Sequence, residues 1–264
     1  MTMNLDLLGK HALVCGGSQG IGRAAAIELA ALGADVTVLS RSQQTLEAVV
    51  AELPKFDSRQ RHGWLIGDMN EHAGLKARVE KLVGERAVHI VINNSGGPPG
   101  GSAHEAALDA FRIAFNQHVM AAQIVLQAVL PGMRNARFGR IVNVISTSVK
   151  EPIRNLGVSN TVRGAMASWA KTLAGELGAD GITVNNVLPG YTRTQRLDQI
   201  LSDRSAASGK TEAEVAAVML ASVPAARFAE PAEVAAAIAF LCSPAAGYIN
   251  GINLPVDGGR MQSL

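Results

Sequence analysis

The stretch Cys15-Gly16-Gly17-Ser18-Gln19-Gly20-Ile21-Gly22 decides the fold of this chain. It follows an apolar run at residues 11–15, which suits a buried strand, and precedes an alanine-rich segment at residues 23–32, which favours a helix. Glycines at such a strand-to-helix turn let backbone N–H groups approach a pyrophosphate, and the start of the helix attracts negative charge. The spacing Gly-x-x-x-Gly-x-Gly therefore predicts a phosphate site, with a glycine-rich turn that binds nothing as the alternative.

Length and charge restrict the class of protein. The chain has 264 residues without a proline- or serine-rich linker, so we expect one α/β domain with a large core. The formal net charge is only +2, the basic residues are scattered, and 4% of the residues are aromatic. Nucleic-acid binding is not expected, because the sequence has neither a basic footprint nor stacking platforms.

The sequence predicts a cytoplasmic protein that does not enter a membrane. Residues 1–10 lack the basic and apolar regions of a secretory signal. No apolar stretch approaches the roughly 18 residues of a membrane span, the richest being residues 119–130 and 234–242. Cys15 and Cys242 each lie in an apolar run without a metal-binding or CxxC pattern, so both are predicted to be reduced core residues. No metal site is predicted.

Strand-like and helix-like segments alternate along the chain. Strands are expected at residues 11–15, 35–39, 63–67, 88–92, 140–145, 182–187 and 252–256. Helices are expected at residues 23–32, 43–53, 71–84, 104–133 with one bend, 159–177 and 230–241. Apolar strands joined by helices are typical of parallel sheets covered on both faces. The pattern predicts an α/β fold with a doubly wound, seven-stranded parallel sheet and helices on both faces.

Motifs in several separate stretches occur in one order. They are Gly16-x-x-x-Gly20-x-Gly22, Asp68, Asn93-Asn94-Ser95-Gly96, Asn116, Ser146, Pro189-Gly190 followed by Thr194, and Val256-Asp257-Gly258-Gly259. Over nearly the whole chain this set resembles the short-chain dehydrogenases/reductases, which bind NAD(P) on a single-domain Rossmann fold. Within that family the chain is similar to the 3-oxoacyl-(acyl-carrier-protein) reductases, with the loop at residues 96–100 typical of a divergent branch. Ser95 stands where the family usually has alanine.

The resemblance implies a cofactor site along the ends of the strands. The implied cofactor-binding residues are Gly16, Ser18, Gln19, Gly20, Ile21, Gly22, Ser40, Arg41, Asp68, Met69, Asn94, Ser95, Gly96, Arg163, Pro189, Gly190, Thr192 and Thr194. The three motif glycines would hold the pyrophosphate, and Asp68 would approach the adenine amino group. A turn residue is the alternative for Asp68. Asn93 is interpreted as a residue that makes hydrogen bonds between strands.

The end of the second strand predicts the choice of cofactor. An acidic residue there would accept the ribose 2′-hydroxyl of NAD, whereas this chain has Ser40 and Arg41. An arginine can bond two oxygens of a 2′-phosphate while carrying full charge. We therefore expect NADP(H), with NAD less favoured. The alternative for Arg41 is a solvated cation at the start of a loop.

The expected catalytic residues depart from the family pattern. The resemblance implies an Asn, a Ser and a Tyr-x-x-x-Lys, with the tyrosine thirteen residues after the serine. Asn116 and Ser146 match, but the last motif is replaced by Ser159-Asn-Thr-Val-Arg163. In the family the phenol donates a proton as hydride arrives, and the lysine bonds the nicotinamide ribose. Arg163 keeps a charge and donors for the ribose, but it cannot lose a proton.

Three substitutes for the missing proton donor are open. Ser159 could relay a proton from water, Ser146 could act with Asn116 and a water chain, or Tyr191 could swing in from its loop. A place in the pocket wall is the alternative for Tyr191. His118 lies two residues beyond Asn116 and so on another helix face, and it is interpreted, like the other histidines, as structural or at the surface.

Two functions follow from these patterns. The first is an NADP-dependent oxidoreductase that reduces a carbonyl, a 3-oxoacyl thioester or another ketone, with an altered acid site. The second is a cofactor-binding sensor, or a subunit of an oligomer, without turnover. Residues 194–223 are predicted to form two short helices, broken at Ser208-Gly209, that act as a lid over a moderately apolar small-molecule substrate. A homotetramer is expected, because residues 119–130 and 234–241 are apolar over more than one face.

Overall fold

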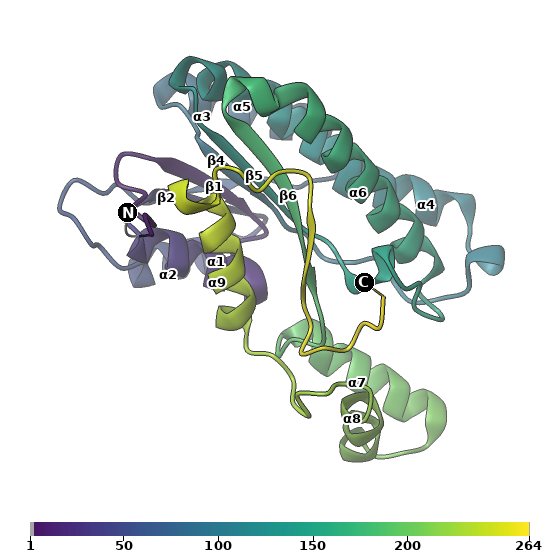
Figure 1. The fold of residues 1–264 in the computed structure, drawn as a ribbon. Coiled ribbons are helices and arrows are strands. Elements are labelled where there is room, and N and C mark those ends of the chain that lie inside the picture. The colour runs from purple at the N-terminus through teal and green to yellow at the C-terminus, as the bar shows by residue number, and fades with distance from the viewer. Residues whose placement is uncertain (1–2, 264) are drawn as a thin grey trace.

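A seven-stranded parallel sheet forms the centre of the computed structural model, which describes residues 3–263 (Figure 1). Its strands are β1 His11–Cys15, β2 Asp35–Ser40, β3 Gly63–Ile66, β4 Ile90–Asn93, β5 Gly139–Val144, β6 Ile182–Pro189 and β7 Asn253–Val256. The order across the sheet is β3-β2-β1-β4-β5-β6-β7. The order reverses between β1 and β4, which is the switch point where ligands bind in doubly wound folds. The predicted fold class is confirmed.

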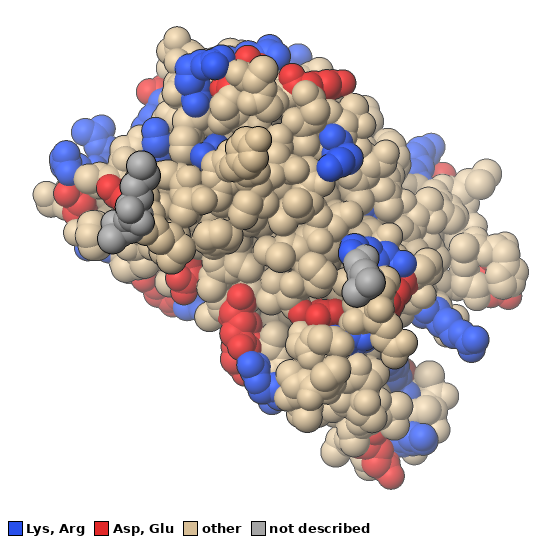
Figure 2. Space-filling model, viewed as in Figure 1, with Lys and Arg blue, Asp and Glu red and all other residues tan. Residues whose placement is uncertain are grey.

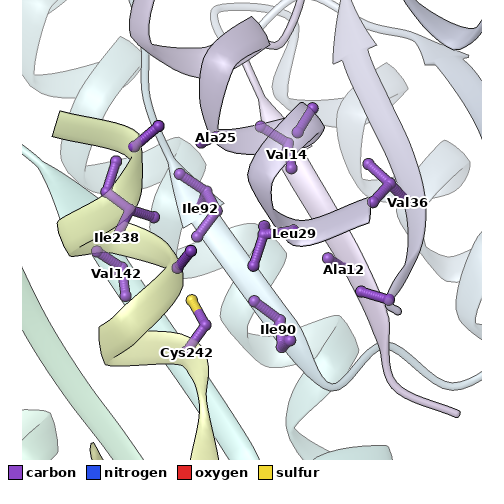
Figure 3. Packing of buried hydrophobic residues seen from close by; sticks show 14 of the residues in the cluster. Ala12, Val14, Ala25, Leu29, Val36, Ile90, Ile92, Val142, Ile238 and Cys242 are labelled. Atoms are coloured by element: carbon purple, nitrogen blue, oxygen red, sulfur yellow. The ribbon is translucent and has the colours of Figure 1, made fainter. Parts of the chain in front are cut away.

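Helices cover both faces of the sheet. The α-helices of residues 3–263 are α1 Gly20–Ala31, α2 Gln43–Glu52, α3 His72–Glu85, α4 Leu108–Phe115, α5 Ala121–Ala136, α6 Gly157–Leu177, α7 Gln195–Ser208, α8 Glu212–Leu220 and α9 Pro231–Cys242. Side chains alternate along each strand, so Ala12 and Val14 of β1 face α1, α2 and α9, whereas Leu13 and Cys15 face α3, α5 and α6. Figure 3 shows the first of these two cores, in which Leu29 of α1 and Ile238 of α9 pack over Ile90 and Ile92 of β4.

The long helix expected at residues 104–133 changes from α to π geometry at Asn116. A 3₁₀ turn, Ala103–Glu105, precedes α4, and a π-helical turn, Asn116–Met120, joins α4 to α5. A π turn inserts an extra residue into the helix and is frequent at functional sites. The sequence predicted one bend in this helix and did not specify a π turn.

The joined helix Leu108–Ala136 is long and apolar enough to span a membrane by length and composition. The sequence interpretation counted only uninterrupted apolar runs and missed this length. The inner face of α5 lies in the core, where Val125, Val129 and Met133 pack between α3 and the sheet. The helix therefore behaves as a core helix of this fold. Cys15 and Cys242 are free and buried as predicted, and burial raises the pKa of each thiol to about 12.

The helices α7 and α8 stand apart from the sheet, at the lower right of Figure 1. They share a small apolar cluster built from Leu197, Val215, Met219 and Phe228. Gly209, with a φ of 69°, ends α7 in the left-handed region that favours glycine. The break predicted at this position is observed.

Candidate active site

The glycine turn after β1 forms a cradle that only glycine can line. Gly16 and Gly20 have φ values of 60° and 55°, in the region where other residues are strained. A Cβ on Gly22 would collide with the carbonyl oxygen of Gly16 and would lie 2.7 Å from Asn94 Nδ2. Asn94 fixes the turn from β4, because its Nδ2 donates to the Gly16 carbonyl oxygen at 3.1 Å. The start of α1 therefore keeps its N–H groups open for an anion.

The segment after β6 lies against this turn. A Cβ on Gly20 would be 3.1 Å from Thr194 Cγ2, so the residue that begins α7 sits beside the glycine cradle. Thr192 and Thr194 fold the segment with hydrogen bonds to the carbonyl oxygens of Gly190 and Thr192. These contacts bring Gly20 and Thr194 together, although they are 174 residues apart in the sequence.

The end of β2 carries the predicted 2′-phosphate position. Arg41 is exposed, and Ser40 Oγ is enclosed without a hydrogen-bond partner. An enclosed hydroxyl without a partner is unfavourable, and a ligand oxygen would satisfy it. Asp68 accepts a hydrogen bond from the Asn70 backbone N–H at 2.9 Å, which is the turn role considered for it. Met69 is buried beside it.

The expected catalytic residues do not form a hydrogen-bonded group. Ser146 caps the 3₁₀ turn Thr147–Val149, and its Oγ accepts from the Ser148 N–H at 3.1 Å. The Asn116 carbonyl oxygen accepts from His72 Nε2 at 3.1 Å. The Asn116 residue lines a hollow of about 330 Å³ between α4 and α6, together with Phe115 and Val162. Across residues 3–263, no hydrogen bond joins Ser159 to Ser146.

Arg163 is the most unusual side chain of the site. It is 8% exposed, and its Nη1 donates to the Val144 carbonyl oxygen at the end of β5 at 2.8 Å. Burial, and then the positive charge of Arg196, lower the pKa of its guanidinium to about 10. A buried charge without an acidic partner is unfavourable in itself. Arg163 is thus held at the end of β5, and its guanidinium has more N–H donors than the acceptors that it contacts.

His118 lies in this site, which the sequence interpretation did not foresee. Its Nδ1 is 2.8 Å from Ser95 Oγ, while its Nε2 is buried without a hydrogen-bond partner. Burial and the charge of Arg163 lower the pKa of His118 to about 3, and the Gly96 backbone acts in the opposite sense. The imidazole is therefore neutral at ordinary pH. His118 and Asn116 lie on different faces of the helix, as expected. His118 faces inward, while Asn116 lines the outer hollow between α4 and α6.

Asn93 begins a ladder of amide hydrogen bonds across the sheet. Its Nδ2 donates to Asn143 Oδ1, Asn143 donates to Asn186, and Asn186 donates to Asn253, each at 2.8 Å. The four residues are paired in register on β4, β5, β6 and β7. The interpretation of Asn93 as a residue bonding between strands is confirmed.

Tyr191 packs as part of the wall near α7. Its ring meets Phe228 edge to face with centroids 6.2 Å apart, and the Arg260 guanidinium lies 4.6 Å from its centroid. These contacts favour the pocket-wall role over that of a mobile proton donor.

Fold and site together define a dinucleotide-binding protein of the doubly wound α/β class, with its site at the switch point. The family model described as Enoyl-(Acyl carrier protein) reductase matches residues 16–260. Cyclohexanol dehydrogenase of Rhodococcus sp. (strain TK6) is 35% identical over 282 residues, with 100% of both chains covered. The 3-oxoacyl-(acyl-carrier-protein) reductase of Vibrio harveyi is 33% identical, with 97% of this chain and 98% of the relative covered.

Solved structures agree with this assignment. L-sorbose reductase of Gluconobacter frateurii, complexed with NADPH and L-sorbose, has a TM-score of 0.92 and 30% identity, covering 99% of this chain and 100% of that chain. The NADPH-dependent reductase YwfH has a TM-score of 0.91 and 27% identity, covering 97% and 99%. The chain belongs to the short-chain dehydrogenase/reductase family of oxidoreductases. The predicted family and enzyme class are confirmed.

Proposed function

We propose that this protein is an NADP(H)-dependent oxidoreductase that reduces the carbonyl group of a small molecule with an altered acid site. NADP(H) is the cofactor, in line with the relatives and solved structures whose names include NADPH. The residues present fit this group. Gly22 keeps the phosphate cradle open, and the enclosed Ser40 hydroxyl beside Arg41 is free to accept a 2′-phosphate.

One observation carries the proposal of an altered acid site. Arg163 is buried at the end of β5, one helical turn after Ser159, where the family has lysine after tyrosine. When bound, the nicotinamide supplies the hydride, so no protein nucleophile is required. Arg163 would bind and orient the ribose through its spare donors. Ser146, with its Oγ fixed by Ser148, would donate a hydrogen bond to the carbonyl oxygen, and a solvent water would supply the proton that completes the alcohol.

The substrate class is a ketone or a 3-oxoacyl thioester. Relatives in the same range of similarity are named for cyclohexanol, tropinone, L-xylulose and 3-oxoacyl substrates, so similarity alone does not choose among them. The α7–α8 segment, residues 96–102 and residues 148–157 would select the substrate, because hydrogen bonds from Arg196 to Pro98 and from Gly101 to Asn155 connect the three segments.

The test is the consumption of NADPH, followed by absorbance, across a panel of ketones and 3-oxoacyl thioesters. We expect slow reduction of at least one member and a further loss in Ser146→Ala. NADPH binding without turnover of any member would instead favour the sensor or non-catalytic subunit. The control is Ser168→Ala on the exposed side of α6, which should keep the parent rate.

We also propose a homotetramer in the cytoplasm. The apolar residues at 119–130 and 234–241 lie largely in the core of the single chain, so the proposal rests instead on α4, where Leu108, Ile113 and Phe115 are 87%, 53% and 41% exposed. Phe115 lines the hollow between α4 and α6, which a second copy of the chain would cover. Light scattering at micromolar concentration should give a tetramer, and Leu108→Glu with Phe115→Glu should reduce its size. A monomeric parent would refute the proposal.

A further inference from the structure

The space between β4, the π turn and α6 holds an enclosed polar cavity. It is lined by Asn93, Ser95, His118, Val144 and Arg163, among others, and its volume is about 10 Å³. A cavity needs at least about 10–15 Å³ to hold one water molecule. The cavity therefore has room for one water molecule at most.

Two residues that line this cavity carry a buried atom without a hydrogen-bond partner. Among residues 3–263, six buried side-chain atoms lack a hydrogen-bond partner, and two of them, Asn93 Oδ1 and His118 Nε2, belong to residues that line it. Native proteins leave few such atoms unsatisfied, and each requires an explanation. The guanidinium of Arg163 also lines the cavity and has N–H donors that no acceptor in the described part of the chain occupies.

These groups supply a complete set of partners for one water molecule. Arg163 offers an N–H donor, whereas Asn93 Oδ1 and His118 Nε2 are acceptors. Asn93 is a strong acceptor, because its amide donates into the asparagine ladder and hydrogen bonds in a chain polarise one another. With Nε2 accepting, the neutral imidazole carries its hydrogen on Nδ1 and donates it to Ser95 Oγ.

We propose that Arg163, one buried water molecule, His118 and Ser95 form a directed hydrogen-bond network that positions Arg163 and Ser95 in the cofactor site. Its direction runs from the Arg163 N–H through water to His118 Nε2, and from His118 Nδ1–H to Ser95 Oγ. The hydroxyl hydrogen of Ser95 is left as the free donor of the network, on the Asn94–Ser95–Gly96 segment. His118 and Ser95 are positioning residues.

The network links residues that the sequence presents as unrelated. Arg163 replaces the family's lysine, Ser95 replaces its usual alanine, and His118 had no role assigned to it. The lysine head group is a compact ammonium, whereas the longer guanidinium reaches Val144 and the Gly97 region, where a Cβ would lie 3.8 Å from its Nη2. The altered side chain thus comes with altered neighbours.

The first test is a high-resolution crystal structure of the protein. Density for one water molecule within hydrogen-bond distance of Asn93 Oδ1, His118 Nε2 and Arg163 is expected. An empty cavity, or a direct bond between two of these groups, would overturn the proposal whatever the enzyme turns over.

The second test is a double-mutant cycle with NADPH affinity as the readout, measured by fluorescence titration. Ser95→Ala and His118→Leu should each weaken binding about 3- to 10-fold, and the double variant should be no weaker than the weaker single one, because both changes interrupt one network. His118→Gln, which keeps hydrogen-bonding groups, should recover part of the loss. Multiplying effects of the two changes would overturn the proposal.

The matched control is His11→Leu. His11 is also buried and also bonds a hydroxyl, with Nε2 2.8 Å from Thr37 Oγ1, but it lies at the opposite end of the strands. This variant should lower the thermal stability as His118→Leu does, while NADPH affinity stays unchanged. The binding readout is independent of turnover, so failure of the proposed carbonyl reduction would leave this test intact. If His11→Leu also lost NADPH affinity, the loss in His118→Leu would reflect the removal of a buried histidine in general. That result would overturn the proposed role of His118 as a positioning residue.

Discussion

The glycine turn after β1 and the start of α6 face the same site but differ in how far they keep the family pattern. The turn keeps every glycine, because backbone contact with Gly16 leaves no room for a Cβ at Gly22. The start of α6 replaces both characteristic side chains with Ser159 and Arg163, yet the helix and its contact with β5 remain. At the glycine turn, close backbone contacts leave no room for a Cβ at Gly22. At the start of α6, the side chains can change in type as long as the neighbouring side chains change too. Figure 2 shows basic and acidic residues interspersed on one face of the molecule.

The sharpest way to break this comparison is to restore the family pattern on α6. Ser159→Tyr with Arg163→Lys should raise the turnover of an active parent by about 10²–10⁴, the range of general-acid catalysis, because a phenol and a cation then lie one turn apart on one helix face. Steady-state NADPH consumption of the parent, both single variants and the double variant measures this. Only the double variant should gain, so the effects should be strongly non-additive.

A double variant slower than an active parent would show that Ser159 and Arg163 serve another mechanism.

The second prediction concerns the cofactor end of the comparison. NADPH should bind more tightly than NADH by about 1.5–3 kcal/mol, the value of a charge-assisted hydrogen bond, and Arg41→Asp should reverse that preference. Fluorescence titration with both cofactors measures it. Lys81→Asp, an equal change of charge on the exposed side of α3, should leave the preference unaltered. Equal affinities in the parent protein would contradict the role of Arg41.

The third prediction tests how strictly the turn requires glycine. Gly22→Ala should lower the free energy of unfolding by about 1–3 kcal/mol, because its Cβ has to displace the backbone of Gly16, and NADPH binding should weaken with it. Chemical denaturation and titration measure the two effects. The control is Gly84→Ala in α3, where a Cβ meets nothing within 4 Å and should stabilise the helix slightly. A stable Gly22→Ala variant with full affinity would show that the cradle can relax.

The effect that is smallest near neutral pH is the acid sensitivity of the π-turn side of the site, where His118 lies. The pKa of His118 is lowered from its ordinary 6.5 to about 3 in the folded chain, so the unfolded chain binds the extra proton first as the pH falls below 6.5. Stability is therefore present above pH 6.5 and lost progressively between pH 6.5 and about 3, by at most about 1.4 kcal/mol per pH unit. His118→Gln should flatten this part of the profile of unfolding free energy against pH. The exposed His104→Gln is the control, and a profile unchanged in His118→Gln would contradict the prediction.

Much of the fold could be predicted because its signals are local. The apolar runs gave the seven strands to within about two residues, and the glycine break at Gly209 gave the division of α7 from α8. The π turn at Asn116 is missed by such reasoning, since it changes the helix by one inserted residue and leaves the apolar pattern almost intact. The apolar stretches at residues 119–130 and 234–241, which had suggested subunit contacts, are largely buried in the core of the single chain. The exposed apolar side chains lie on α4 instead.

The sequence by itself determined the order of the strands and helices, the glycine cradle, the loss of Tyr-x-x-x-Lys, and Asn93 as a residue between strands, because each depends on residue type at fixed spacing along the chain. Only the tertiary structure decided that His118 faces inward, that it meets Ser95, and that Arg163 is buried beside them at the end of β5. These residues come from three elements that are distant in the chain. Their pKa values and hydrogen bonds depend on burial and on distances of a few ångströms, which arise only when β4, the π turn and α6 pack together.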